Sequence, residues 1–424
     1  MSEMSYLEKL LDGAEVEWRN LGDTSLFEIA NNGRKPVKAS LRIAGETPYY
    51  GANNIQDYVD GYTHDGEYVL IAEDGSASLE NYSIQYATGK FWANNHVHVV
   101  RGKERVHSRF LYHYLCIVNF LPFLTGGGRA KLTKGQLIEI PVPIPCPDNP
   151  EKSLAIQSEI VRILDKFTAL TAELTAELTA RKKQYNYYRD QLLSFDEEQE
   201  KPIYLEKLLD GVEVEWLPLG VLGELVRGNG LPKTDFTEAG IPAIHYGQIY
   251  TFYGLSTETT KSFVSQDTAK KLKKVNTGDV VITNTSENLD DVGKALVYLG
   301  KEQAVTGGHA TIFKPNKGII GKYFAYFTQT NSFFNEKRMY SKGTKVIDVS
   351  ASDMAKITIP IPCPNNPEKS LSIQSAIVRI LDKFDTLTNS ITEGLPREIE
   401  LRQKQYEYYR DLLFSFPKPD SVTN

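Results

Sequence analysis

The sequence predicts an α+β protein in which two globular domains are separated by two long helices that pair as an antiparallel coiled coil. Two observations lead to this prediction. Three blocks of sequence occur twice along the chain, which indicates an internal pseudo-twofold repeat. The segments between these blocks differ, whereas a long apolar seam follows in each copy. The chain should therefore build one helical frame twice and attach two different inserts to it.

The repeated segments are residues 6–18 and 204–216, 140–167 and 357–384, and 183–190 and 404–411. The first pair differs at one of 13 positions, and the second pair is identical at 23 of 28. We call residues 19–139 the first insert and residues 217–356 the second insert. Repetition this close predicts that the repeated segments make one set of contacts twice, while the inserts perform distinct tasks.

The length of 424 residues allows two or three domains, each with its own core. Our predicted boundaries are an N-terminal conserved segment at 1–18, a first globular domain at 19–147, a central helical region at 148–216, a second globular domain at 217–364 and a distal helical region at 365–424, kinked near 394–396. Hydrophobic residues make up 41% and charged residues 24%, as in ordinary globular proteins. We expect a cytoplasmic protein without membrane contact, because no basic, apolar leader is evident.

The cysteines and charges add two further expectations. Three cysteines do not suggest a disulfide framework, and Cys146 and Cys363 occupy matching repeat positions, which favours a packing role. Residues 19–146 contain 13 basic and 12 acidic side chains, and residues 217–363 contain 17 and 13. With a total charge of −6, the rest of the chain has a net charge of −11. Mildly basic inserts on an acidic frame suggest that the inserts contact an anion and the frame contacts protein.

Each central repeat begins a long helix. Asn149-Pro150-Glu151 and Asn366-Pro367-Glu368 combine a capping side chain, a first-turn proline and an acidic residue at the positive end of the dipole. The first helix should extend from about residue 153 to 194, and Gly394-Leu395-Pro396 should kink or break the second. The predicted pairing positions are Ile160, Leu164, Phe167, Leu174, Leu178, Tyr185 and Tyr188 in the first helix, and Ile377, Leu381, Phe384, Ile391, Tyr406 and Tyr409 in the second. An intermolecular coiled-coil dimer is the alternative.

The inserts share a weak common pattern, in which a turn and a buried strand precede an amphipathic helix. Residues 66–71 correspond to 278–283, and residues 110–124 correspond to 323–334. The loops between these elements are unrelated, which is expected of two recognition modules that read different sequences.

The loops contain side chains suited to DNA. Asn and Gln amides can pair with adenine, Ser and Thr can bond to bases or phosphates, and Lys and Arg can contact the backbone. The candidates in the first insert are Tyr50, Gly51, Asn53, Asn54, Ser76, Ser78, Asn94, Asn95, His96, Arg129, Lys131 and Lys134. Those in the second insert are Tyr246, Gly247, Gln248, Asn284, Thr285, Ser286, His309, Lys342, Thr344 and Lys345.

Each candidate also has a simpler explanation. An Asn or Ser in a glycine-rich loop is often a turn former, and His96 and His309 could have structural roles. Gly126-Gly-Gly-Arg129 is not a phosphate loop, because no Gly-Lys-Ser/Thr opens a helix after it. A metal site is not expected, since acidic and cysteine ligands are missing at ligand spacing. The sequence also lacks methyltransferase, Walker and nuclease motifs that we recognise, so no catalytic residue is assigned.

The repeat pattern resembles the specificity subunit of type I restriction–modification systems. The resemblance covers nearly the whole chain and includes the Ile-Pro-Cys-Pro-x-Asn-Pro-Glu-Lys-Ser segments, the Gln-Tyr-x-Tyr-Tyr-Arg-Asp segments and the Thr-Ala-Glu-Leu units at 171–178. The tandem units are present in the central helix alone, which departs from strict twofold symmetry.

This resemblance implies two target-recognition domains that each read half of a bipartite double-stranded DNA site. It implies two methyltransferase subunits and restriction subunits as partners. S-adenosylmethionine, ATP and Mg are expected on those partners, with no cofactor on this chain. Two alternatives are a DNA methyltransferase or nuclease in its own right, which the missing motifs disfavour, and a structural coiled-coil scaffold, which the divergent inserts disfavour.

Overall fold

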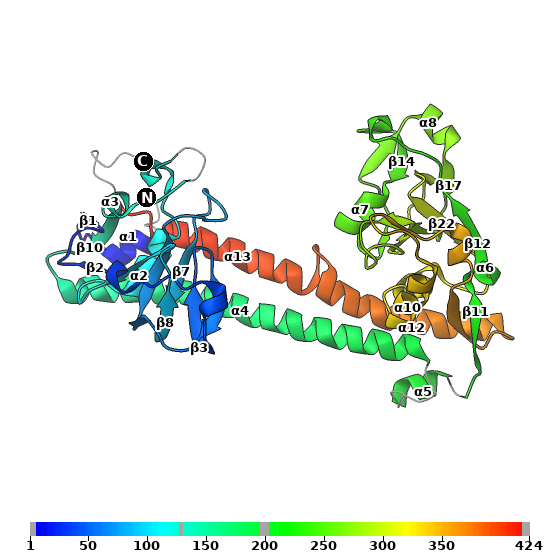
Figure 1. Ribbon diagram of the computed structural model, residues 1–424, viewed down its shortest axis with the longest axis horizontal. Coiled ribbons are helices and arrows are strands. Elements are labelled where there is room, and N and C mark those ends of the chain that lie inside the picture. Colours follow the sequence, from blue (N-terminus) through cyan, green and yellow to red (C-terminus); the bar gives the residue numbers. More distant parts are fainter. Residues whose placement is uncertain (1–5, 127–129, 196–202, 210, 418–424) are drawn as a thin grey trace. The chain divides into compact units, whose positions relative to one another are not determined.

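The computed structural model describes residues 6–126, 130–195, 203–209 and 211–417 (Figure 1). The chain forms two compact units, the first from Met1–Glu173 with Glu400–Asn424 and the second from Leu174–Ile399. The division falls inside two helices, α4 (Pro150–Ser194) and α13 (Gly394–Leu413). Among the described residues, no helix combines the length and apolar character needed to cross a membrane.

The first unit contains two four-stranded sheets within its described residues, ordered β2-β9-β6-β7 and β4-β3-β8-β5. Its strands are β1 (Val16–Asn20), β2 (Phe27–Ile29), β3 (Ala44–Tyr50), β4 (Ile55–Val59), β5 (His64–Asp65), β6 (Tyr68–Ala72), β7 (Ile84–Ala87), β8 (Lys90–Ala93), β9 (Val97–Gly102) and β10 (Pro141–Pro145). Its helices are α1 (Tyr6–Leu11), α2 (Ser108–Leu115), α3 (Lys134–Leu137) and the adjoining parts of α4 and α13, with 3-10 turns η1 (Asn31–Gly33), η2 (Ala39–Leu41) and η3 (Leu121–Phe123).

The second unit contains two five-stranded sheets within its described residues, ordered β12-β22-β18-β20-β15 and β13-β16-β14-β21-β17. Its strands are β11 (Val214–Pro218), β12 (Gly223–Arg227), β13 (Phe236–Thr237), β14 (Ile241–Ile244), β15 (Ser256–Thr257), β16 (Ser262–Val264), β17 (Lys273–Val275), β18 (Val280–Thr283), β19 (Thr285–Ser286), β20 (Ala295–Tyr298), β21 (Ala304–Thr306), β22 (Ala310–Pro315), β23 (Ile347–Asp348) and β24 (Thr358–Pro362). Its helices are α5 (Ile203–Leu209), α6 (Leu219–Leu222), α7 (Tyr246–Thr251), α8 (Gln266–Lys271), α9 (Gly321–Phe327), α10 (Asn331–Tyr340), α11 (Ala351–Met354) and α12 (Pro367–Asn389), with the 3-10 turn η4 (Lys233–Asp235). The mixed α+β class predicted from the sequence is confirmed.

The repeated segments form the same small sheet in each unit. β1 pairs antiparallel with β10 from Val16 opposite Pro145, and β11 pairs with β24 in the same register. A cysteine with a left-handed backbone follows each proline-rich strand, with φ 49° at Cys146 and 52° at Cys363. The amide of Cys146 donates to Glu15 and that of Cys363 to Glu213, so both positions join the two segments through the backbone.

The helix starts are as the sequence predicts. The side chain of Asn149 accepts a hydrogen bond from the Lys152 amide at 3.0 Å, and Asn366 accepts from the Lys369 amide at 3.1 Å. Both bonds satisfy amides that would otherwise lack a partner in the first turn of the helix. Identical caps place α4 and α12 identically after their proline-rich strands.

A buried glutamine on each helix fixes the adjoining insert. The amide oxygen of Gln157 on α4 accepts from the backbone amide of His107, directly before α2, at 2.9 Å. Gln374 on α12 accepts from the amide of Ile320, directly before α9, at the same distance. Both side chains are 0% exposed, so an unpaired amide here would be costly. This repeated contact positions two otherwise different inserts.

An aspartate two turns further along makes a second contact with each insert. Asp165 accepts from Arg109 Nε and His113 Nε2 of α2, both at 2.8 Å. Its repeat equivalent Asp382 accepts from Lys322 Nζ of α9 at 2.9 Å and from the Tyr326 hydroxyl at 2.6 Å. The frame residue is thus repeated, whereas the donors on the inserts differ in chemistry.

The long helices pack together inside each unit. In the first, Phe167 of α4 stacks on Tyr409 of α13 with ring centroids 5.2 Å apart. In the second, Tyr185 and Tyr188 of α4 stack on Phe384 of α12 at 6.3 and 5.5 Å. All five of these aromatic residues are among the predicted pairing positions.

Other predicted pairing positions have different surroundings. Ile160, Leu164 and Tyr406 pack with the core of the first unit, and Ile377 and Leu381 are buried in that of the second. Leu174 and Leu178 are half-buried. Ile391 is 75% exposed, because α12 ends at Asn389 and α13 begins at Gly394. Gly394 has φ +75°, and a Cβ atom there would lie 2.4 Å from the Thr386 oxygen, so the break requires glycine.

A buried histidine gives the first unit a predicted pH dependence. His113 is fully buried; its Nε2 donates to Asp165, its Nδ1 lies 3.1 Å from the Tyr406 hydroxyl, and burial lowers its pKa to about 4. In the unfolded chain the same imidazole titrates near pH ~6.5 and therefore binds protons that the folded protein does not. We expect the free energy of unfolding to decrease as pH falls from about 6.5 towards 4.

Urea titrations across this pH range measure the effect. His113→Gln should lower the free energy of unfolding at neutral pH. That free energy should then decrease less between pH 6.5 and 4, because the variant lacks the imidazole with the lowered pKa. Burial also lowers the pKa of His98, so part of the decrease in the free energy of unfolding should remain in this variant. An unfolding midpoint for the native chain that stays constant or rises on acidification over this range would contradict the assignment of a neutral His113.

Candidate nucleic-acid interface

The loops of the first unit are held by their own polar side chains. The Asn53 amide donates to the Gly75 oxygen and accepts from the Ala77 amide, both at 2.8 Å. The Ser76 hydroxyl donates to the Ser78 oxygen at 2.7 Å, and the Ser78 hydroxyl accepts from the Asn81 amide. Asn53 therefore joins the β3–β4 turn to the 75–83 loop, and Ser76 and Ser78 brace that loop internally.

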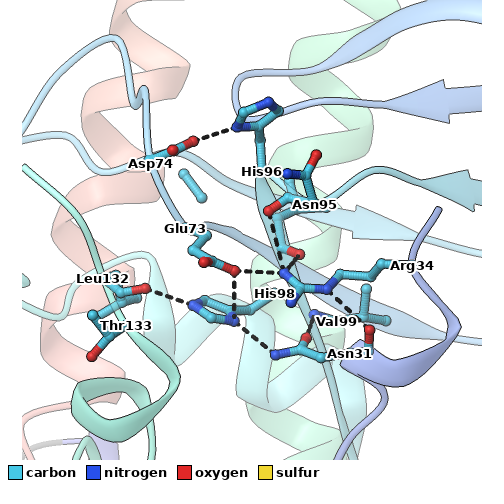
Figure 2. A network of polar contacts seen from close by, with 12 residues as sticks. Asn31, Arg34, Glu73, Asp74, Asn95, His96, His98, Val99, Leu132 and Thr133 are labelled. Atoms are coloured by element: carbon cyan, nitrogen blue, oxygen red, sulfur yellow. Dashed lines mark hydrogen bonds and ion pairs between the residues drawn. The ribbon is translucent and has the colours of Figure 1, made fainter. Parts of the chain in front are cut away.

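A polar network lies beneath the next candidate loop (Figure 2). The Arg34 guanidinium binds Glu73 at 2.6 Å and the carbonyl oxygens of Asn95 and Val97 at 3.4 and 2.8 Å. Lys131 binds the second oxygen of Glu73 at 2.9 Å. Burial alone would raise the pKa of Glu73, but hydrogen bonds from Arg34 and Lys131 outweigh it and lower that pKa. A charged Glu73 thus links Lys131, through Arg34, to the 94–97 turn.

His98 completes this network from below. It is 0% exposed, and its Nε2 donates to the Leu132 oxygen at 2.7 Å while its Nδ1 lies 2.9 Å from the Asn31 amide nitrogen. Burial lowers its pKa, so the neutral form with Nε2 protonated fits both bonds. His98 was not a predicted site residue. Its structural role could have been suspected from its place inside an apolar strand.

The turn itself presents two of the predicted side chains. Asn95 is exposed, and His96 is partly exposed with its Nδ1 2.5 Å from Asp74 (Figure 2). Asn94 is buried and accepts from the His96 amide. These contacts fix the turn backbone and leave the Asn95 side chain towards solvent.

The remaining first-insert candidates are spread over several elements. Tyr50 and Gly51 are buried, Asn54 is exposed and accepts from the Ile55 amide, and Lys134 is exposed at the start of α3. Arg129 lies outside the described residues. Gln56 was not predicted, yet it is exposed and lies across Gly51, where a Cβ atom would be 2.0 Å from its amide nitrogen.

In the second unit, several candidates meet around His309. This imidazole is exposed, its Nδ1 lies 2.9 Å from the Thr285 hydroxyl, and its ring centroid is 4.8 Å from that of Tyr246. Tyr246 in turn lies 4.7 Å from His245, whose Nδ1 accepts from the Gly247 amide. Imidazole and phenol rings of this kind can stack on bases or donate to phosphates.

Other second-insert candidates support this group or lie beside it. Asn284 is fully buried, accepts from the Thr311 hydroxyl at 2.5 Å and donates to the Gly308 oxygen. Gln248 donates to the Ser262 hydroxyl at 2.5 Å. Ser286 is partly exposed and accepts weakly from the Asn288 amide. In the loop before β23, Thr344 and Lys345 are exposed, whereas Lys342 binds Asp353 at 2.9 Å.

These features define the class of protein. Two diverged, loop-bearing β domains are attached to one repeated helical frame through the same glutamine and aspartate contacts. That organisation belongs to a protein with two recognition surfaces. Among the described residues, no three His, Cys, Asp or Glu side chains are placed to hold a metal ion.

Comparison with known proteins identifies the family. Residues 14–181 and 212–401 match the type I restriction modification DNA specificity domain. The chain therefore belongs to this family, and it is the DNA specificity subunit of a type I restriction–modification system, a non-catalytic component of the complex.

Two relatives extend the match over the full length. A putative type I restriction enzyme specificity subunit of Haemophilus influenzae is 44% identical over 421 residues, covering 97% of this chain and 98% of the relative. The EcoR124I/EcoR124II specificity subunit of Escherichia coli is 38% identical over 443 residues, covering 100% of both. The crystal structure of the S subunit from M. genitalium shares the fold, with a TM-score of 0.55 at 16% identity over 98% of this chain and 100% of that one.

Proposed function

We propose that the two globular domains, residues 19–147 and 217–364, each read one half of a bipartite double-stranded DNA target. The observation that supports this proposal is the repeated contact of Gln157 and Gln374 with inserts whose loops differ. A shared frame with different loops is what two half-sites of unrelated sequence require. The frame itself comprises residues 1–18, 148–216 and 365–424.

The DNA contacts in this proposal come from the predicted loop residues of both inserts. In this proposal, exposed side chains such as Asn95, His309 and Lys345 contact bases or phosphates directly. Asn53 and Asn284 act by holding loop backbones, since their amides bond to neighbouring loop groups. Loop positioning is thus assigned to the amides that bond to loop groups, including that of exposed Asn53, and direct reading to Asn95, His309 and Lys345.

The proposed partners are two methyltransferase subunits, with restriction subunits joining for cleavage. A related structure, titled as the basis of complex assembly and conformational transition of the type I R-M system, covers 94% of this chain at a TM-score of 0.50. S-adenosylmethionine, ATP and Mg belong to these partners in our proposal, and the complex acts in the cytoplasm. This chain supplies sequence recognition and the geometry of assembly.

A pair of equivalent tyrosines marks the proposed methyltransferase contacts. Tyr187 is 59% exposed and Tyr408 is 64% exposed, and they occupy the same position in the repeated segments 183–190 and 404–411. Each lies edge-on to the next tyrosine, with both ring-centroid distances 5.4 Å. Large exposed aromatic rings are common anchors of protein interfaces. One such ring in each unit suits two copies of one partner.

Alanine variants test this assignment. In co-expression with the methyltransferase subunit, the native chain should bind two copies, Tyr187→Ala or Tyr408→Ala should retain one firmly bound copy, and the double variant should lose both. Truncation of an anchor tyrosine typically weakens binding by more than about 1 kcal/mol. Native mass spectrometry gives the stoichiometry, and methylation of DNA with S-adenosylmethionine gives the activity.

Tyr62→Ala is the matched control, because Tyr62 is 50% exposed but lies in the first insert. It should keep two bound copies. All these rings are exposed, so the variants should remain folded, which circular dichroism can verify. A double variant that still binds two methyltransferase subunits with native affinity would remove these tyrosines from the interface.

A further inference from the structure

Two exposed lysines border the candidate surface of the second unit. Lys271 ends α8 and Lys273 begins β17, and both are exposed while Leu272 between them is 5% exposed. The backbone at Leu272 is extended, with φ −97° and ψ 156°. Because successive side chains alternate in extended backbone, a buried Leu272 directs both neighbouring lysines outward. Figure 1 shows α8 and β17 at the end of this unit away from α12.

A side-chain hydrogen bond and strand pairing join this lysine pair to the surface around His309. The Asn229 side-chain amide donates to the Lys271 carbonyl oxygen at 2.6 Å, and the Asn229 backbone forms a β-bridge with Gly307. Lys273 pairs with Thr306 in the β17–β21 ladder, three positions before His309. The segments around Gly228 and Gly307 also approach closely through their backbones, since a Cβ atom on Gly228 would lie 2.1 Å from the Gly307 oxygen. The lysines are therefore held by the same turns that place His309.

The charge of this pair is not neutralised locally. Within the described part of the chain, neither Lys271 nor Lys273 forms an ion pair. Lys342, in contrast, binds Asp353, a carboxylate whose pKa is lowered by hydrogen bonds from Lys356 and Lys342. Arg227 is likewise paired with Asp348 at 3.2 Å. Lys271 and Lys273 thus add positive charge beside the surface at a place that the loop motifs did not indicate.

We propose that Lys271 and Lys273 bind phosphates of the DNA half-site that the second insert reads. This inference rests on the proposed function and names the phosphate contact of that site. Two lysine ammonium groups that flank a buried leucine at the junction of α8 and β17 suit consecutive backbone phosphates, which they bind without regard to base identity. The contact would fix the duplex against the second insert while exposed loop residues around His309 read bases.

The test measures salt-dependent DNA binding by the full chain assembled with its methyltransferase subunits. The probes are a labelled duplex containing the methylated site mapped in the host genome and a scrambled duplex of equal length. The double variant Lys271→Gln/Lys273→Gln should bind both duplexes more weakly. Its slope of log affinity against log salt should be shallower by about 1.8, from about 0.9 per phosphate contact. Between about 50 and 200 mM salt, the native complex should lose about tenfold more affinity than the variant.

Lys317→Gln is the matched control. Lys317 is also exposed, but it follows the opposite end of β22, beside Gly318, whose oxygen accepts from Gln374 of α12. Its replacement should leave the slope unchanged. All three substitutions are on the surface and keep a long, polar side chain, so loss of folding is not expected.

Three outcomes distinguish the possibilities. An unchanged slope in the double variant, with normal binding by the native complex, overturns the phosphate contact and leaves the proposed function intact. β17 is an edge strand, so the two lysines could instead serve to prevent its pairing with the sheet of another molecule. In that case the double variant would show the unchanged slope and would also self-associate. A native complex that does not prefer the mapped duplex over the scrambled one would instead contradict the proposed function.

Discussion

Exchange of the first insert, residues 19–139, for that of a relative with another target should change one half of the methylated sequence and preserve the other. The old site should lose methylation, because each mismatched base pair costs about 1–3 kcal/mol and several would be mismatched. The second insert keeps its own contacts through Gln374 and Asp382, so its half-site should stay the same. Sequencing of modified bases in cells that express the chimaera measures both halves.

The frame contacts define which exchanges should assemble. The insert taken from the relative must offer a backbone amide to Gln157, as His107 does here. It must also offer hydrogen-bond donors to Asp165, as Arg109 and His113 do. The reciprocal exchange of residues 217–356 is the control and should change the other half alone. A chimaera that alters both halves while still binding the methyltransferase subunits would refute separate reading by the two inserts.

A longer central helix should lengthen the unread spacer between the half-sites. Residues 171–174 and 175–178 are tandem Thr-Ala-Glu-Leu units within α4, and the division between the two units of the structure falls among them. Leu174 and Leu178 are half-buried, whereas the alanines and glutamates are exposed. A third tetrapeptide should therefore extend the helix without disturbing a core.

The size of the change can be calculated from helix geometry. One added tetrapeptide lengthens the helix by ~6 Å and rotates the residues after it by about 40° beyond a full turn, which the helix pairing can absorb. At ~3.4 Å per base pair, we expect about one extra base pair of spacer and no more than about two. Both half-site sequences should stay the same, and methylation of the original site should be lost.

Maps of methylated sites for chains with one, two and three tetrapeptides measure this effect. The chain with two is the native control, and the spacer should grow from one tetrapeptide to three. An identical spacer in all three chains would show that the helices do not set the distance. Loss of all methylation in a folded, assembled chain would show that the inserted turn breaks the geometry rather than extends it.

The frame could be predicted from sequence because its signals are local and repeated. The Asn149 and Asn366 caps, the aromatic positions Phe167 and Phe384, and the break before Gly394 each agree with short-range rules that the structure obeys. Ile391 was assigned to the seam because the heptad was continued through a segment that is not helical. Periodicity alone did not locate the end of α12.

The contacts between frame and inserts could not be predicted in the same way. Gln157 and Asp165 lie on a helix where polar residues ordinarily face solvent, and their partners, in α2 or directly before it, are about 50 residues away in sequence. The same glutamine and aspartate occur in both repeats, and this identity was a signal of a structural contact, because solvent-exposed positions rarely require one particular polar residue. Lys271 and Lys273 were missed because their significance depends on which neighbouring cations are already paired.

The most direct test of two-insert recognition is a methylation map of cells that contain this chain and its methyltransferase subunit but no restriction subunit. We predict one bipartite motif, in which two short specific sequences flank a gap of fixed length and any composition. Deletion of this chain should abolish methylation at that motif. A single continuous motif, or methylation that persists without the chain, would contradict recognition by two separate inserts on a shared frame.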